Sequence, residues 1–235
     1  MSNPADDLAF DSAAIRSNFE KAQTYADALF SGKDMTSSVQ DDNDSIGIYK
    51  YWSYEGEPDK APISSEIEID GNKIVIGTTT AKEVEGFDLT VDKSKATAQP
   101  GETVSLSLSK GDRSCSAMLA PNDTDKEMKI DDLPVYEVVT SVKDFSLPFT
   151  YCGLSADSTL EEVLEALGTP NFTATLSSED MGVFIELNYN NQSQEDGKLI
   201  SDSVILRLVY DLDSNTARVD NIDLRHEVNT AVTES

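Results

Sequence analysis

The chain is poor in the residues on which most recognised catalytic and metal sites depend. Its 235 residues include one histidine, two cysteines and one tryptophan. The histidine, His226, follows the last apolar run, and we expect it in a solvated tail, where it could not serve a Ser-His-Asp or Cys-His mechanism. The nucleotide-binding glycine motifs, the G-x-S-x-G motif of hydrolases and the H-E-x-x-H motif of zinc proteases do not occur. The sequence therefore predicts no catalytic residue, no metal and no cofactor, and we expect a protein that is not an enzyme.

Basic residues are also scarce. Eighteen lysines and arginines stand against 44 aspartates and glutamates, which gives a formal net charge of −26. Binding to nucleic acid or to an anionic membrane depends on clustered basic side chains, and the densest group here is the scattered pair Lys93 and Lys95. We therefore exclude nucleic acid as a partner and expect no membrane contact by this segment. The same charge favours solubility and could steer a basic protein partner towards the surface.

Long hydrophobic runs are missing, and cysteines are too few to build a disulfide framework. No stretch approaches the 18 apolar residues of a transmembrane helix, and the start, MSNPADDLAF, has neither the basic residues nor the apolar run of a signal peptide. Cys115 and Cys152 could form one disulfide, which would indicate an oxidising compartment. Two buried free thiols are the other interpretation, since free cysteine packs as a small hydrophobe. The sequence leaves both open.

The N-terminal part contains an amphipathic helix and an aromatic strand. Apolar residues recur every three or four positions from Ser12 to Phe30, and Gly32 can end the helix. The polar residues 33–45 predict a loop. The following segment, 46–58, predicts a strand that holds the densest aromatic cluster of the chain. Such residues are either ordinary strand residues that cover a core or binding anchors, because tyrosine and tryptophan dominate interface hot spots. The candidate binding residues are Tyr49, Tyr51, Trp52 and Tyr54.

Two similar series of elements follow. In the first, a hairpin turns at Asp70-Gly71-Asn72 and a short helix is expected over 78–87. Strands are then expected at 89–91, 103–108, 115–119 and 135–142. In the second, a short strand at 147–151 leads to a helix that opens at Ser158-Thr159 and ends at Gly168, and three alternating strands follow. The fold class is α+β, with helices packed on antiparallel sheets.

The expected organisation has four parts. An N-terminal leader, the amphipathic helix and the aromatic strand occupy 1–60, a first helix-on-sheet unit occupies 61–142, a second occupies 143–226, and a tail occupies 227–235. The two units share the order of their elements and a Gly–Thr/Ser pattern before the helix. An internal duplication is one interpretation of this order.

Acidic residues offer two further candidates for a site. The turn Asp211-Leu212-Asp213-Ser214-Asn215 begins like a calcium loop, but Thr216 stands where glycine is needed and Ile222 stands at the twelfth position. A hairpin turn explains these residues. Glu161 and Glu162 are adjacent in the first turn of a helix, where carboxylates favour the helix dipole. A pair of carboxyl groups that converge in space remains the one catalytic arrangement that the sequence does not argue against.

The stretch from Gly153-Leu154-Ser155, through Thr159-Leu160-Glu161-Glu162-Val163, to Gly168-Thr169-Pro170 carries a family resemblance. It resembles the small-lipoprotein repeats of the SmpA/OmlA type and the tandem-repeat beta-lactamase inhibitory proteins, and it is similar to secreted or lipid-anchored proteins of gut Gram-positive bacteria. The resemblance covers about 75 residues at the C-terminal end, and a weaker similarity to the same pattern begins at Gly77. It implies two tandem units of the beta-lactamase inhibitory protein type, each a helical layer on a curved antiparallel sheet, in an exported protein.

Relatives of this type bind other proteins through the open face of the sheet. The first unit lacks the full T-φ-E-E helix (φ apolar), and no segment matches an inhibitor's contact loop. The leading hypothesis is therefore a non-enzymatic, extracytoplasmic protein-binding or scaffold module of a bacterial cell-surface protein, secreted or anchored by a signal outside the given sequence. The alternatives are a carboxylate-dependent enzyme acting on cell-wall sugars and a purely structural ectodomain. The sequence predicts neither the partner nor the oligomeric state.

Overall fold

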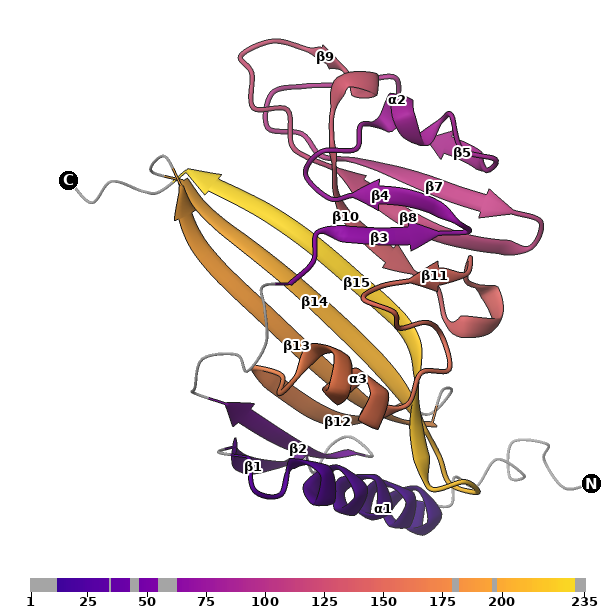
Figure 1. Cartoon of the computed structure of the whole chain (residues 1–235), viewed down its shortest axis with the longest axis vertical. Helices are drawn as coiled ribbons and strands as arrows, with labels where there is room; N and C mark the ends of the chain where they lie inside the picture. Colours follow the sequence, from indigo (N-terminus) through magenta and orange to yellow (C-terminus); the bar gives the residue numbers. More distant parts are fainter. Residues whose placement is uncertain are drawn as a thin grey trace, which may run out of the picture.

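One large antiparallel sheet organises the molecule. The computed structural model describes residues 12–33, 35–42, 47–54, 63–178, 182–195 and 198–230. Ten strands form the large sheet in the order β1-β2-β12-β13-β14-β15-β10-β8-β7-β5 (Figure 1). In chain order these strands are β1 (Met35–Asp42), β2 (Gly47–Tyr54), β5 (Thr90–Lys93), β7 (Val104–Lys110), β8 (Arg113–Leu119), β10 (Val135–Thr140), β12 (Phe172–Ser178), β13 (Gly182–Glu195), β14 (Lys198–Asp211) and β15 (Thr216–Thr230).

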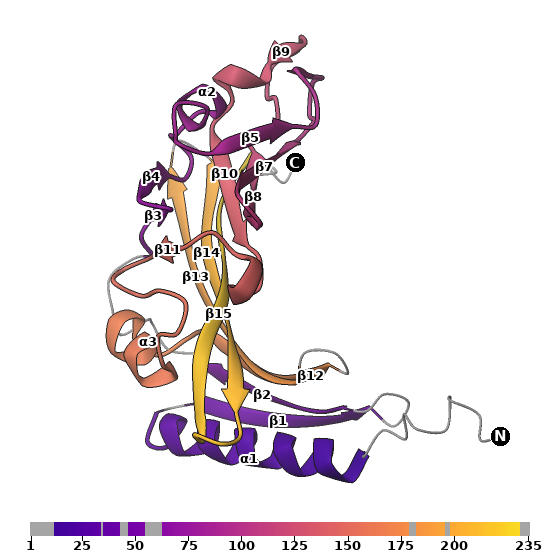
Figure 2. The same ribbon diagram turned by 90° about the vertical axis from the view of Figure 1, so that its right-hand side faces the viewer.

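Smaller elements cover one face of this sheet. The helices are α1 (Ser12–Phe30), α2 (Ala81–Val84) and α3 (Leu160–Leu167), and the strands β3 (Glu66–Ile69), β4 (Asn72–Val75) and β11 (Phe149–Thr150) form a three-stranded sheet. The strands β6 (Thr97–Ala98) and β9 (Met128–Lys129) pair separately. Figure 2 shows α2, α3 and the three-stranded sheet on the same side of the long strands. A single hydrophobic core lies between these elements and the large sheet.

The N-terminal helix joins the same core. Its buried residues Phe19, Ala22, Ala26 and Phe30 follow helical spacing and belong to the cluster that contains the inward side chains of β13 to β15. The ring of Tyr25 packs 5.7 Å, centroid to centroid, from that of Tyr210 on β14. The predicted helix and its docking within the chain are therefore confirmed. Among the described residues no helix is both long and apolar enough to span a bilayer.

Most of the predicted elements are present, and three predictions are wrong. Residues 35–42 form the edge strand β1 rather than part of a loop, because a strand that is polar on both faces carries no alternation in its sequence. Four strands rather than three follow α3, since β12 was missed. The last strand continues to Thr230, so His226 lies in β15 and not in a tail. The coarse class, helices on antiparallel sheets, is confirmed, with far more strand than helix.

The helices α2 and α3 begin in the same way. Thr80 caps α2 and accepts a hydrogen bond from the Glu83 amide, while the Glu83 carboxylate accepts one from the Thr80 amide. Thr159 and Glu162 form the same reciprocal pair at α3. A capping box satisfies two backbone groups that the first turn leaves free. Local sequence thus sets the start of both helices.

The residues before each cap pair with a central strand of the sheet. The Val135 amide of β10 donates to the Thr79 carbonyl at 2.7 Å, and the Val219 amide of β15 donates to the Ser158 carbonyl at 2.8 Å. In both strands the next residue is bulged, Tyr136 in β10 and Asp220 in β15. The bulges and the capped segments leave only three residue pairs, 137–139 with 223–225, between β10 and β15. We call these three pairs the seam.

Gly77 lies in the segment before α2, close to the ring of His226. Its φ is +80°, and an added Cβ would lie 2.9 Å from Cδ2 of His226. Gly153 has the same φ of +80° with no atom within 4 Å of an added Cβ. We expect Gly153→Ala to lower the free energy of unfolding by about 1–2 kcal/mol, the cost of a left-handed residue. Gly77→Ala should cost about 1–3 kcal/mol more because the imidazole must move. Urea unfolding measures both, and equal losses would contradict this packing.

Candidate functional site

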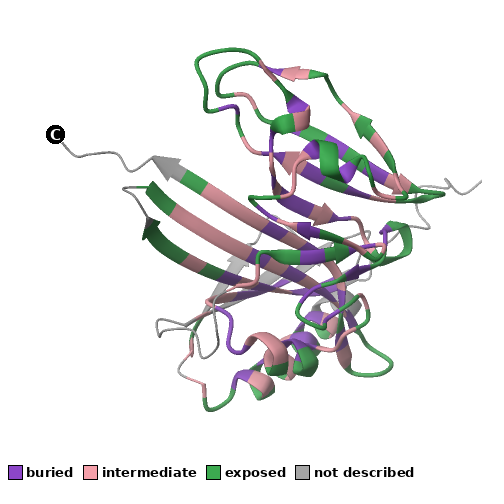
Figure 3. Ribbon diagram, turned by 45° about the horizontal axis from the view of Figure 1, so that its top comes forward, coloured by how far each residue is buried: buried purple, intermediate pink, exposed green. Residues whose placement is uncertain are grey.

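The face of the large sheet opposite the helices is open. On β14, Val204, Leu206, Leu208 and Tyr210 are buried towards the helices, while the alternating residues from Ser203 to Val209 are only partly buried. None of the three described helices packs against the second set. Exposure increases towards the free ends of β13 to β15 (Figure 3). The open face is therefore a surface with a regular lining of strand residues.

A charged cluster lies at the seam on this face. The register places Glu137 of β10 opposite Arg225 of β15. Nη2 of Arg225 lies 2.6 Å from Oε1 of Glu137 and 3.7 Å from Oδ2 of Asp223, and its Nη1 lies 3.3 Å from Oε1 of Glu227. Glu137 is only 8% exposed. The Arg225 guanidinium thus contacts three carboxylates, so the cluster of these four residues carries a net negative charge.

Asp223 is the perturbed member of the cluster. Burial, and then the neighbouring carboxylate of Glu137, raise the pKa of Asp223 to about 6, while Arg225 opposes the shift. A carboxyl group that titrates near neutrality beside a second carboxylate is an arrangement that acid–base enzymes use, and structural ion-pair networks also produce it. Here both carboxylates share Arg225, which is the geometry of an ion-pair network.

Several buried polar atoms around this cluster have no protein hydrogen-bond partner. They are Oδ1 of Asn188, Nε of Arg207, Oδ1 of Asp223 and Nε of Arg225. Asn188 and Asp223 flank Ile205 on adjacent strands, and Arg207 lies two residues along β14. Buried polar atoms are almost always hydrogen-bonded. The centre of the open face therefore encloses both donors and acceptors that the described side chains leave unsatisfied.

The four predicted aromatic anchors lie on β2, at positions whose side chains are outside the described part of the structure. The register pairs Tyr51 with Ala174 and Trp52 with Thr173. Ala174 pairs with Glu186, an open-face residue, whereas Thr173 pairs with the core residue Leu187. Because strand positions alternate between faces, Tyr49 and Tyr51 occupy open-face positions and Trp52 and Tyr54 occupy helix-face positions.

His226 has a structural environment that the sequence did not indicate. Its Nδ1 lies 2.6 Å from Oδ1 of Asp202, its register partner on β14, and its ring contacts the backbone of Gly77. The prediction of a solvated tail residue failed because the polar sequence after Leu224 hides the continuation of β15. The histidine instead helps to fix the loop before α2 to the strand.

The two cysteines are free. Cys115 is buried on the helix side of β8 and Cys152 is exposed. Burial raises the pKa of the Cys115 thiol to about 12, which leaves it protonated and unreactive at neutral pH. The disulfide interpretation is therefore wrong, and so is the burial expected of Cys152.

The acidic candidates from the sequence have structural roles. The Asp211 carboxylate accepts hydrogen bonds from the backbone amides of Asp213 and Ser214 and from the Ser214 hydroxyl, so it closes the hairpin turn. The Glu161 carboxylate accepts a hydrogen bond from the Tyr25 hydroxyl at 3.0 Å and joins α3 to α1. In the described part of the chain, no group of three or more histidine, cysteine or acidic residues is placed to hold a metal ion.

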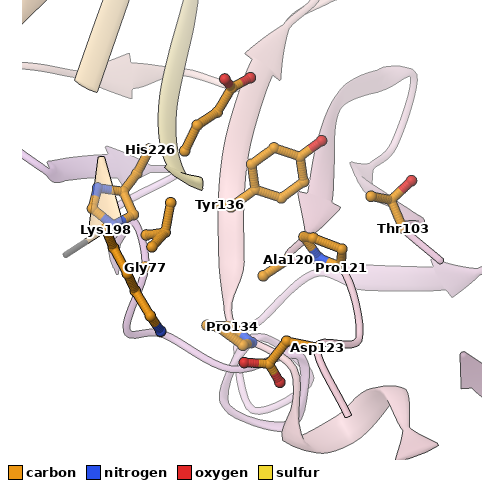
Figure 4. Close-up of a pocket in the computed structure, with 11 residues that line it drawn as sticks. Gly77, Thr103, Ala120, Pro121, Asp123, Pro134, Tyr136, Lys198 and His226 are labelled. Atoms are coloured by element: carbon orange, nitrogen blue, oxygen red, sulfur yellow. The ribbon is translucent and has the colours of Figure 1, made fainter. Parts of the chain in front are cut away.

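A notch opens where β15 diverges from β10 beyond the seam. It encloses about 480 Å³ and has mainly apolar walls, from Ala120, Pro121, Pro134, Tyr136 and Val228. Polar groups of Asp123, Lys198, His226 and Glu227 stand around it (Figure 4). Ligand pockets usually enclose about 300–1,000 Å³. The notch is the second candidate binding surface.

The comparisons with known proteins give no relative. The chain has no significant match among protein-family models, curated protein sequences or solved structures.

Sequence reasoning missed the cluster at the seam. Its charged residues occupy the polar positions of alternating strands, where they look like solvated surface. Only the pairing of β10 with β15 brings Glu137 to Arg225, 88 residues apart in the chain. A search for charged residues at the polar positions of the longest strands would have identified Arg207, Asp223 and Arg225 as candidates.

The raised pKa of Asp223 makes a testable contribution to stability. The folded protein holds the proton up to about pH 6, whereas an unfolded aspartate loses it near pH 4. The stability of the fold should therefore fall as the pH rises through this window. Asp223→Asn should raise the free energy of unfolding by about 1–2 kcal/mol at pH 7.5 and by nearly nothing at pH 4. Urea unfolding between pH 4 and 7.5 measures the difference.

Asp92→Asn is the matched control, because Asp92 is an exposed residue of β5. It should shift stability by less than about 0.5 kcal/mol at every pH. An Asp223→Asn protein that is less stable than the parent at pH 7.5 would show that Asp223 stabilises the fold through Arg225, contrary to this account.

Proposed function

We propose that the protein is a non-enzymatic binding or scaffold module that engages another protein through the open face of its large sheet. The observation that supports this most strongly is the division of the sheet. The three α-helices cover one face, and the other bears a buried charged cluster with unsatisfied donors and acceptors. Interfaces are built from a desolvated centre inside a polar rim. The seam cluster has the composition of such a centre.

We also propose that the chain contains two tandem units of the beta-lactamase inhibitory protein type, over 61–142 and 143–226. One half of the sheet contains the strands β5-β7-β8-β10, which come after α2 in the chain. The other half contains β12-β13-β14-β15, which come after α3. Each half has the same capping box, the same backbone pairing before the cap and a bulge at the same place in its last strand. Duplication explains all of these likenesses together.

An extracytoplasmic location on a bacterial cell surface belongs to the same proposal. It rests on the resemblance of residues 153–170 to secreted and lipid-anchored proteins. The free cysteines neither require nor oppose an oxidising compartment.

A carboxylate-dependent enzyme that acts on cell-wall sugars is the second candidate. The raised pKa of Asp223 beside Glu137 favours it. The ion pairs that both carboxylates make with Arg225 favour the binding module, because a general acid must be free to meet its substrate. A purely structural ectodomain is the third hypothesis, and the absence of any binding partner in a pull-down would favour it.

The two pairs of aromatic residues on β2 allow a matched test. Tyr49→Ala/Tyr51→Ala changes open-face positions, and Trp52→Ala/Tyr54→Ala changes helix-face positions. We expect the first double variant to weaken partner binding by about 30-fold or more, the loss of one hot spot, with little change in stability. The second should lower the free energy of unfolding by about 3 kcal/mol or more, the usual cost of replacing large aromatic residues at core-facing strand positions.

The measurements are pull-down from cell-surface extracts, affinity for the captured partner and urea unfolding. Unchanged capture by the Tyr49→Ala/Tyr51→Ala protein would remove these residues from the proposed interface. Cleavage of cell-wall oligosaccharides that Glu137→Gln abolishes would support the enzyme instead.

A further inference from the structure

We propose that the notch between β10 and β15 accepts an extended, basic segment of another protein, which adds as a strand to the free edge of β15. This site is separate from the open face and does not depend on its role. The strand β15 pairs with β14 along its whole length, to Thr230, but with β10 only from Asp223 to Arg225. Five residues of β15 therefore extend beyond the seam, and no strand of the described part of the chain pairs with their β10-side edge.

The backbone groups of this edge point into the notch. The amide and the carbonyl of Ile222 both contact the Thr140 hydroxyl on β10, so Ile222 directs its backbone groups to the β10 side. Strand residues alternate in this respect, so His226, Val228 and Thr230 direct theirs to the same side. The Glu137–Arg225 pair is closed by the hydrogen bonds of its flanking residues and so engages the amide of His226, whereas Val228 and Thr230 lie beyond the last β10 partner. A row of unpaired amides and carbonyls is the template for strand addition.

The walls of the notch can receive the alternating side chains of such a strand. Pro121, Pro134 and the Tyr136 ring form an apolar wall across from β15, and Val228 is 48% exposed on β15 itself. Tyr136 lies at the bulge of β10, which turns it out of the regular register. Strand addition gains affinity from main-chain hydrogen bonds and specificity from side-chain pockets, and the notch has both components.

Charge identifies the class of partner. Asp123 and Glu227 line the notch, with Lys198 as the one lysine among the described residues beside them. Burial and then the carboxylate of Glu137 raise the pKa of the Tyr136 hydroxyl, Arg225 opposes this shift, and Glu227 and Asp223 add to it. The whole chain carries a net charge of −26. This potential attracts a basic segment and repels a second copy of the chain.

The probe is a synthetic seven-residue peptide of alternating lysine and valine, blocked at both ends, added to the whole chain. Its controls are a glutamate–valine peptide and a lysine–valine peptide that is N-methylated along one edge. We expect the lysine peptide to bind at least about tenfold more tightly than either control, because one lacks the charge and the other the hydrogen bonds. It should also slow amide exchange at Val228 and Thr230 by about fivefold or more.

Two variants at one position separate the backbone from the side chain. Val228→Pro removes an amide that faces the notch, a position where a strand tolerates proline because no internal ladder bond is lost. It should abolish peptide binding, while Val228→Ala should retain it within about fivefold. Circular dichroism verifies the fold of both. Should Val228→Pro fail to fold, the N-methylated peptide on the parent protein still tests the same hydrogen bonds.

Equal binding of the N-methylated peptide, or binding without slower exchange at Val228 and Thr230, would overturn the proposal. So would concentration-dependent dimerisation that protects the same two amides, since it would identify a second copy as the occupant. The Tyr49→Ala/Tyr51→Ala protein should bind the peptide as the parent does. Loss of one interaction without the other therefore shows which of the two proposed surfaces is wrong.

Discussion

The short antiparallel seam between β10 and β15 is the constraint on which the rest of the structure depends. It joins the two halves of the sheet, and Val138 and Leu224 at its centre are buried in the common core. On either side of the seam, the segments before α2 and α3 hydrogen-bond to the backbone of Val135 in β10 and Val219 in β15. These strand residues cannot then pair with each other's strands, so the seam stays short. Because the seam has three pairs, no described strand lies along the β10-side edge of β15 beyond Arg225, and the notch opens there. The seam also places Glu137 beside Arg225 and thereby assembles the cluster on the open face.

The charged cluster gives the seam a defined register. Sliding β15 by two residues along β10 would preserve the alternation of faces but would separate Glu137 from Arg225 and leave a buried carboxylate unpaired. Breaking a buried ion pair costs about 3–5 kcal/mol. Hydrophobic side chains at the same positions would pack in either register. We infer that the network contributes more to the choice of register than to net stability, in keeping with the raised pKa of Asp223.

Local sequence predicted the elements whose signals are local. The N-terminal helix, the hairpin at Asp70-Gly71 and the capped start of α3 follow from spacing and capping residues within a few positions. The edge strand β1 was missed because its residues, MTSSVQDD, have no apolar face. The site was beyond prediction for another reason. Glu137 and Arg225 are 88 residues apart in the chain, and only the pairing of β10 with β15 brings them together.

The two proposed surfaces are linked through β15. Arg225 belongs to the open face, Val228 directs its backbone groups into the notch, and Glu227 pairs with Arg225 while it lines the notch. Five residues of strand extend about 17 Å beyond the seam, and β14 supports them on one edge only. A strand added in the notch would supply the second neighbour and hold the end of β15 in place. The ion pair between Arg225 and Glu227 would then be held more rigidly, and the open face would be more ordered for its own partner. Occupation of the notch should therefore favour binding on the open face. The conformational entropy of the end of β15 is lost when the first partner binds, so the second partner binds without that loss.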